Sequence, residues 1–173
     1  MRDLVYIHGA GATPADPPWS RLAPLLGDNW NVIAPSLGEP DVARWMSGID
    51  KALEGAGPDA VFFAHSLGVS LLIQTIAAKR RSRRAAGLVG LAAPFWERED
   101  MAEYILPTDF PEALSGFERV ILFQSRDDEV VSAGHLAKWG KRLPQAELHE
   151  LVGVDHVGSR GDISPIVAAI KSL

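Results

Sequence analysis

Strand-like and helix-like segments alternate along the whole of this chain. Short apolar runs rich in β-branched and aromatic residues recur at residues 4–7, 31–34, 60–64, 87–91, 119–123 and 146–151. Most of them are typical of fully buried strands, and the segments between them have apolar residues at helical spacing. The alternation predicts an α/β protein with a mostly parallel six-stranded sheet covered by helices on both faces. Asp16 and Asp41 precede the first two helical segments and are expected to cap them.

Length and composition narrow the class of protein further. The chain has 173 residues, a formal net charge of −5 and no cysteine. No repeat or linker divides it, so we expect a single domain over residues 1–173. The lack of cysteine excludes a thiol nucleophile, and we expect neither a metal nor a cofactor. Residues 1–7 do not resemble a secretory signal, and polar residues interrupt the longest uncharged stretch, so we expect a cytoplasmic protein without a membrane span.

A candidate nucleophile follows the third apolar run. Residues 64–68 read Ala-His-Ser-Leu-Gly and lead directly into a helical segment at residues 69–79. A small-x-Ser-x-Gly turn between strand and helix exposes the serine hydroxyl, and its small flanking residues let the crossing chains approach. Ser36 stands in the same five-residue pattern, but Glu39 and Pro40 follow it and delay the next helix. The sequence therefore predicts Ser66, not Ser36, as a nucleophile.

A serine hydroxyl needs a base, and an imidazole base needs a carboxylate partner. His156 follows the last apolar run, at the edge where ligands of a parallel sheet bind. We interpret the other histidines as packed or solvent-facing residues; they are His8, His65, His135 and His149. Three consecutive acids, at residues 127–129, follow the fifth run. We favour Asp128 over Asp127 as the partner of His156, with Glu129 as a third candidate.

With Ser66, Asp128 and His156 in that chain order, the sequence resembles the α/β-hydrolases. It is most similar to the small, capless serine hydrolase family related to retinoblastoma-binding protein nine, and the likeness extends over essentially the whole chain. In that family the second of two paired aspartates is catalytic, which supports Asp128. The resemblance implies a three-layer α/β-hydrolase fold without a large cap. The retinoblastoma-binding motif of one member contains cysteine, so that partner is not expected here.

The glycine-rich loop after the first apolar run matches the oxyanion loop of that family. We expect the two oxyanion donors to be the backbone N–H of Leu67, at the start of a helix, and that of Ala10, with Gly11 as the alternative to Ala10. The same loop lacks the third glycine of a dinucleotide-binding motif and the lysine of a P-loop. Nucleotide binding is therefore not predicted.

Aromatic residues gather in the longest connection, residues 92–118, which follows the fourth apolar run. We expect Phe95, Trp96 and Tyr104 to form an apolar wall of the substrate pocket, although such aromatics can also only seal a sheet edge. The connection is too short for a lid domain, so an open site for small substrates is predicted.

The basic run at residues 79–84 is the densest cluster of charge. It complements the negative end of a helix, and because the chain is acidic overall we do not expect nucleic-acid binding.

The sequence thus predicts a serine hydrolase that cleaves small carboxylic esters, and less readily amides or thioesters, through an acyl-serine intermediate. The alternative is a binding or regulatory protein on a hydrolase scaffold. We expect a monomer or a weak homodimer.

Overall fold

A single parallel sheet organises the protein. The computed structural model describes residues 1–80, 83–97 and 99–173. Its strands lie in the order β2-β1-β3-β4-β5-β6, and every neighbouring pair is parallel. The six strands are β1 (Arg2–Ile7), β2 (Trp30–Ile33), β3 (Val61–His65), β4 (Ala85–Leu91), β5 (Phe117–Ser125) and β6 (Glu147–Leu151).

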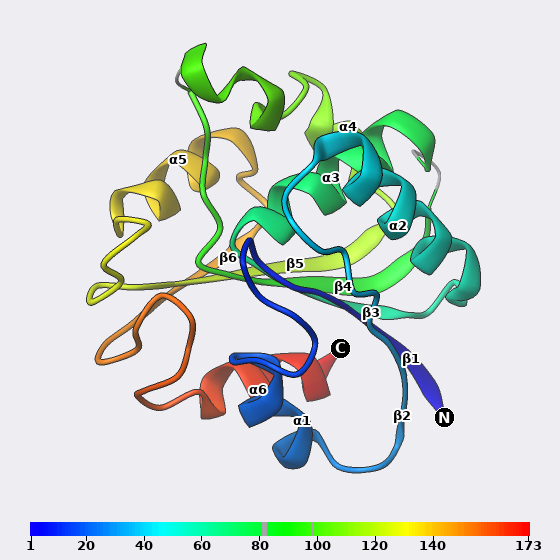
Figure 1. Cartoon of the computed structure of the whole chain (residues 1–173), viewed down its shortest axis with the longest axis vertical. Coiled ribbons are helices and arrows are strands. Elements are labelled where there is room, and N and C mark those ends of the chain that lie inside the picture. Colours follow the sequence, from blue (N-terminus) through cyan, green and yellow to red (C-terminus); the bar gives the residue numbers. More distant parts are fainter. Residues whose placement is uncertain (81–82, 98) are drawn as a thin grey trace.

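Helices cover both faces of this sheet (Figure 1). On one face lie α1 (Trp19–Leu26) and α6 (Ser164–Ser172); on the other lie α2 (Val42–Gly55), α3 (Leu67–Lys79), α4 (Phe110–Ala113) and α5 (Gly134–Arg142). The described part of the connection between β4 and β5 contains only α4 and the 3₁₀ helix η1 (Glu99–Tyr104), so no cap domain is inserted there. The predicted three-layer architecture is confirmed.

The helices pack through apolar stripes, which form one hydrophobic core on each face of the sheet. Trp45, Ile49 and Leu53 of α2 recur at helical spacing and are fully buried in one core. Trp19 and Leu22 of α1 belong to the other. Side chains of the central strands alternate between the two cores, because successive strand residues point to opposite faces.

One predicted helix cap is present and the other is not. Asp41 caps α2, since its side chain accepts a hydrogen bond of 2.8 Å from the backbone N–H of Arg44. Asp16 does not cap α1. Its carboxylate instead accepts hydrogen bonds from the backbone N–H and the hydroxyl of Thr13, and the N-cap residue of α1 is Pro18. The prediction was wrong because Asp16 belongs to the turn before α1 and lies too early in the chain to cap this helix.

Three cations of the basic run, Lys79, Arg80 and Arg83, are paired within the protein. Lys79 and Arg80 form ion pairs with Asp50, and Arg80 also pairs with Glu54. The guanidinium of Arg83 donates hydrogen bonds to three backbone carbonyls between residues 53 and 57. Residues 81 and 82 lie outside the described residues.

In the part of the chain that is described, no helix is both long enough and apolar enough to cross a membrane.

Candidate active site

The carboxyl ends of β3, β5 and β6 bring three predicted side chains together. Because these strands are parallel, the loops that follow them all begin at the same edge of the sheet. Ser66 follows β3, Asp128 lies in the loop after β5, and His156 lies in the loop after β6. Residues far apart in the sequence thereby meet in one site.

Ser66 occupies a strained turn between β3 and α3. Its backbone has φ 51° and ψ −126°, which is uncommon for any residue except glycine. The backbone N–H of Ser66 still donates to the carbonyl of Leu91 at 2.9 Å, so the turn stays attached to β4. Strain of this kind persists only where the surrounding structure enforces it, and here the strained turn places the hydroxyl within reach of His156.

Gly68 allows α3 to cross close to β1. A Cβ atom at this position would lie 2.4 Å from the carbonyl oxygen of His8 and 2.8 Å from that of Ile7. Both distances are below van der Waals contact, so any side chain would push α3 away from the sheet. The second small residue of the serine motif is therefore required by packing.

His156 lies between Ser66 and Asp128. Its Nε2 atom is 3.1 Å from Oγ of Ser66, and its Nδ1 atom is 2.9 Å from Oδ2 and 3.0 Å from Oδ1 of Asp128. A carboxylate can only accept, so Nδ1 is protonated and Nε2 is left to accept the proton of the serine hydroxyl. This arrangement can increase the nucleophilicity of Ser66.

Of the three candidate acids, Asp128 is the one that contacts the imidazole. Its side chain is 1% exposed, and it also accepts hydrogen bonds from Gln124 and from the backbone N–H groups of Val130 and Val131. Burial alone would raise the pKa of Asp128, but the hydrogen bonds from His156 and the two backbone groups outweigh it and hold the pKa below its ordinary value. Asp128 is thus kept ionised against His156.

The neighbouring acids fasten the loop that carries His156. Asp127 accepts a hydrogen bond of 2.6 Å from the backbone N–H of Gly153, and Glu129 accepts one of 3.2 Å from the backbone N–H of His156. Neither carboxylate contacts the imidazole ring. The three consecutive acids therefore divide into one that faces the ring and two that hold the backbone beside it.

The predicted oxyanion donors lie beside Ser66. The N–H of Leu67 is the first of α3 and has no acceptor within the helix. The carbonyl of Gly9 accepts hydrogen bonds from Nδ1 of His8 at 2.8 Å and from the N–H of Ala12 at 3.3 Å. Because the peptide is trans, the N–H of Ala10 points the opposite way from that carbonyl. Ala10 and Leu67 both line the same cavity as Ser66.

Two histidines interpreted as ordinary packed residues support this site. Nε2 of His8 accepts a hydrogen bond from the N–H of Leu37, which leaves Nδ1 as the donor to Gly9. Nε2 of His65 lies 2.9 Å from the carbonyl of His156 and donates to it. Burial lowers the pKa of His65 to about 4, so its ring is neutral at physiological pH. Its Nδ1 is buried without a partner among the described residues.

A cavity of about 500 Å³ opens next to Ser66 and is called the active-site cavity below. Trp96 and Tyr104 line it, as the sequence predicts. Phe95 does not, and here the prediction was wrong. Its ring is 8% exposed and packs edge-on against Trp139 and Phe110 in the core. The full lining is Ala10, Pro40, Ser66, Leu67, Pro94, Trp96, Met101, Tyr104, Val130, Val131, His135 and His156.

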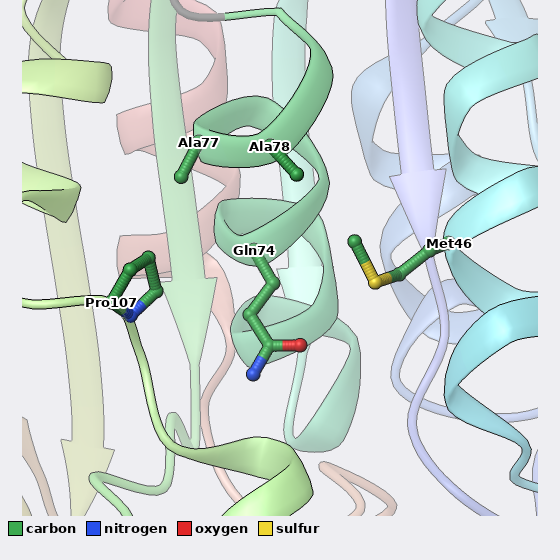
Figure 2. Close-up of a pocket in the computed structure, with 5 residues that line it drawn as sticks. All are labelled: Met46, Gln74, Ala77, Ala78 and Pro107. Atoms are coloured by element: carbon green, nitrogen blue, oxygen red, sulfur yellow. The ribbon is translucent and has the colours of Figure 1, made fainter.

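A second cavity, of about 260 Å³, lies away from this chemistry between α2, α3 and Pro107 (Figure 2). Its polar side chain is Gln74, which Figure 2 shows projecting from α3 between Pro107 and Met46. The amide nitrogen of Gln74 donates to the carbonyls of Glu103 and Ile105, at 3.0 and 2.9 Å. These two carbonyls flank Tyr104, so Gln74 fastens one wall of the active-site cavity to the helix that follows the serine.

Sequence reasoning missed several residues of the site. His135 lines the active-site cavity, although its place in a helix suggested an unremarkable packed residue. Its only signal was its position, a few residues after the acidic loop. Pro40, Pro94 and Met101 gave none, because each lies in a segment without regular spacing. Among the described residues, no three side chains are grouped as the ligands of a metal ion would be.

The fold of the described residues is that of the α/β-hydrolases. A family model described as "Serine hydrolase" matches residues 4–165, and the chain belongs to this family. A search of curated protein sequences found no match.

Several solved structures share the fold over nearly the whole chain. The ydeN gene product of B. subtilis has a TM-score of 0.81 at 13% identity, with 99% of this chain and 98% of that one covered. Est1E from Butyrivibrio proteoclasticus has a TM-score of 0.78 at 14% identity, with 99% and 86% covered. The monoacylglycerol lipase of Paleococcus ferrophilus has 0.70 at 16%, with 98% and 94% covered. Identities this low show the fold alone.

Proposed function

We propose that this serine hydrolase cleaves small carboxylic esters through an acyl-serine intermediate. The observation that supports this most strongly is the position of His156, with one ring nitrogen 3.1 Å from the Ser66 hydroxyl and the other 2.9 Å from the Asp128 carboxylate. Such an arrangement is useful only if a proton has to move from the hydroxyl to the imidazole.

Acylation starts when Oγ of Ser66 attacks the ester carbonyl carbon and its proton passes to Nε2 of His156. The carbonyl oxygen becomes an oxyanion, which the N–H groups of Leu67 and Ala10 stabilise; loss of one such donor typically costs about 3 kcal/mol in the barrier. The tetrahedral intermediate collapses as the C–O bond breaks, and His156 returns the proton to the departing alcohol. Asp128 stabilises the imidazolium throughout.

Deacylation repeats these steps with water as the nucleophile. Nε2 of His156 takes a proton from water, the hydroxide attacks the acyl carbon, and Ser66 leaves with the proton that His156 returns. The active-site cavity opens to solvent beside these groups, since the described part of the chain places no cap domain over it. We therefore propose that small esters are the preferred substrates and that amides and thioesters are slower ones.

The names of similar structures agree with ester chemistry without defining a substrate. They include a monoacylglycerol lipase, a methylesterase from Arabidopsis and a thioesterase domain from the curacin biosynthetic pathway. Each name describes that protein only. Together they favour ester hydrolysis over the alternative of a scaffold that binds but does not react.

Labelling with a fluorophosphonate probe tests the nucleophile. We expect the wild-type protein to be labelled and to hydrolyse p-nitrophenyl acetate and butyrate continuously, and we expect Ser66→Ala to do neither. Ser36→Ala is the matched control, because that serine stands in the same sequence pattern and should remain dispensable. Labelling that survives Ser66→Ala, or steady turnover that survives His156→Ala, would refute the proposal. A labelled protein that turns over no ester in a broad acyl panel would favour the binding alternative.

A further inference from the structure

Few groups on the wall of the active-site cavity are able to hydrogen-bond a substrate. Apart from Ser66 and His156, the described lining side chains with an N–H or O–H group are those of Trp96, Tyr104 and His135. The indole N–H of Trp96 donates to the hydroxyl of Ser70 at 3.2 Å. Burial and the neighbouring carboxylate of Glu103 raise the pKa of Tyr104, so its hydroxyl is neutral and lies beside an internal acceptor. His135 also lines the cavity, and among the described residues its ring has a hydrogen-bond partner at Nδ1 but none at Nε2, which leaves Nε2 for a ligand.

The protonation of His135 follows from its backbone contact. His135 lies in the first turn of α5, and the backbone N–H of Phe95 donates to its Nδ1 atom at 2.8 Å. An Nδ1 atom that accepts carries no proton, so the proton of the neutral ring is on Nε2. Burial, helped by the positive charge of Lys138, lowers the pKa of His135. The ring is consequently a neutral donor at physiological pH.

The charges around His135 favour an uncharged ligand group. Lys138, the cation nearest along α5, forms an ion pair of 2.6 Å with Glu97. Asp128 also acts on the ring electrostatically. Among the described residues that act on the ring, a carboxylate or phosphate bound here would meet two acidic side chains, Glu97 and Asp128, and Lys138 is already paired with Glu97. A carbonyl oxygen avoids this repulsion and still accepts the N–H.

We infer that Nε2–H of His135 forms a polar subsite, which binds an uncharged oxygen acceptor of the substrate while the scissile carbonyl lies at Ser66. The preferred substrates are then esters with a second oxygen, such as a keto or amide carbonyl, several bonds away from the ester. The apolar wall binds the intervening carbon chain. This inference rests on the proposed ester hydrolysis and narrows its substrate class.

Matched pairs of esters test the subsite. In the first series, p-nitrophenyl octanoate is compared with the p-nitrophenyl esters of 5-, 6- and 7-oxo-octanoic acid. In the second, the octyl ester of butyric acid is compared with butyrate esters of the corresponding keto alcohols. The readout is the ratio of kcat/KM for the keto ester to kcat/KM for the plain ester. This ratio cancels any change in folding or in the chemistry common to both substrates.

A hydrogen bond between neutral groups corresponds to roughly a three- to tenfold preference. We expect the wild-type ratio to reach this range for one position of the keto group, in one of the two series. His135→Phe removes the donor and should lower the ratio to one or below, because the keto oxygen then enters the cavity without a partner. His135→Gln can accept from Phe95 and donate to the ligand, and should restore part of the preference.

His149→Phe is the control, because this histidine lies on β6 against Phe123, outside the active-site cavity, and its variant should keep the wild-type ratio. Wild-type ratios near one throughout both series would overturn the subsite but leave ester hydrolysis intact. A preference for the keto ester that His135→Phe does not change would likewise overturn the subsite and leave ester hydrolysis intact. Failure to hydrolyse any of the esters would instead overturn the proposed function, and the subsite with it.

Discussion

Adjacent residues of the loop after β5 have different surroundings, and these differences define their roles. Asp128 is turned inward, where it meets the ring of His156 and two backbone N–H groups. Asp127, one position earlier, reaches the backbone of Gly153 instead. A loop of this kind presents successive side chains in different directions. An aspartate at one position therefore contacts the imidazole ring, and its neighbour contacts the backbone.

Substitution of each aspartate by asparagine should separate the two roles. Asp128→Asn is expected to lower kcat for p-nitrophenyl butyrate by roughly 10³- to 10⁴-fold, because an amide can stabilise the wrong tautomer of His156 and cannot stabilise the imidazolium. Asp127→Asn keeps an oxygen acceptor for Gly153 and should cost less than about tenfold. Steady-state kinetics on both variants would contradict this assignment if the two losses were equal or reversed.

His65, the residue before the nucleophile, donates a hydrogen bond to the backbone carbonyl of His156. Because its ring is buried, the free energy of unfolding depends on pH. The folded pKa of about 4 lies below the ordinary value of 6.5, so the unfolded chain binds a proton more readily. The contribution of His65 to the free energy of unfolding is therefore complete above pH 6.5. It is lost as the pH falls towards 4, which lowers this free energy by at most about 3 kcal/mol.

His65→Gln should flatten that dependence. Glutamine does not titrate, and its amide can still donate to the carbonyl of His156. The free energy of unfolding in urea, measured from pH 7 to pH 4, should therefore fall less steeply for His65→Gln than for the wild type. His149→Gln, at an exposed position, is the control and should keep the wild-type slope. Parallel curves for His65→Gln and wild type would show that His65 is not the source of the slope.

At the scale of elements, α3 both presents Ser66 and fastens part of the substrate wall. Gln74 lies on this helix and holds the two carbonyls on either side of Tyr104. The amide of Gln74 thus helps to hold η1 in place relative to the serine. The serine motif predicted a helix after Ser66, but it could not show that a glutamine on that helix would hold a segment far along the chain.

Gln74→Leu should disturb this wall while leaving the chemistry intact. Loss of both hydrogen bonds leaves two carbonyls without their partner, so we expect a loss of about 1–3 kcal/mol in stability. KM for p-nitrophenyl butyrate should rise more than kcat falls, since Tyr104 moves but Ser66 and His156 do not. Met46→Leu, in the same cavity of Figure 2 but without a hydrogen bond to η1, should leave KM unchanged. A fall in kcat alone for Gln74→Leu would contradict this account.

At the scale of the whole molecule, two hydrophobic cores share one sheet. Trp45 and Trp139 belong to the core beneath α2, α3 and α5, whereas Trp19 belongs to the core beneath α1 and α6. The strands contribute side chains to both, so neither core can form without the sheet. We therefore expect the chain to unfold as one cooperative unit, as the predicted single domain over residues 1–173 implies.

Urea unfolding followed by two probes tests this expectation. A variant with Trp19 and Trp30 both replaced by phenylalanine keeps tryptophans only on the side of the larger core. A variant with Trp45, Trp96 and Trp139 replaced keeps Trp19 and Trp30 at the smaller one. Within each variant, the midpoint from tryptophan fluorescence should coincide with that from far-ultraviolet circular dichroism. Midpoints that differ between the probes in either variant would show that the two faces unfold separately.

The sequence by itself determined the layered fold and the neighbourhood of the site. Alternating apolar runs require a parallel sheet, and parallel strands end at one edge, so Ser66 and His156 could be placed near each other without coordinates. These are local properties, read from spacing and from the residues that flank a turn. Tertiary structure alone decided which acid reaches the imidazole, that Phe95 is a core residue and that His135 lines the active-site cavity. The direction of a side chain in a loop or at a helix end depends on contacts with distant segments, and residue spacing carries no information about them.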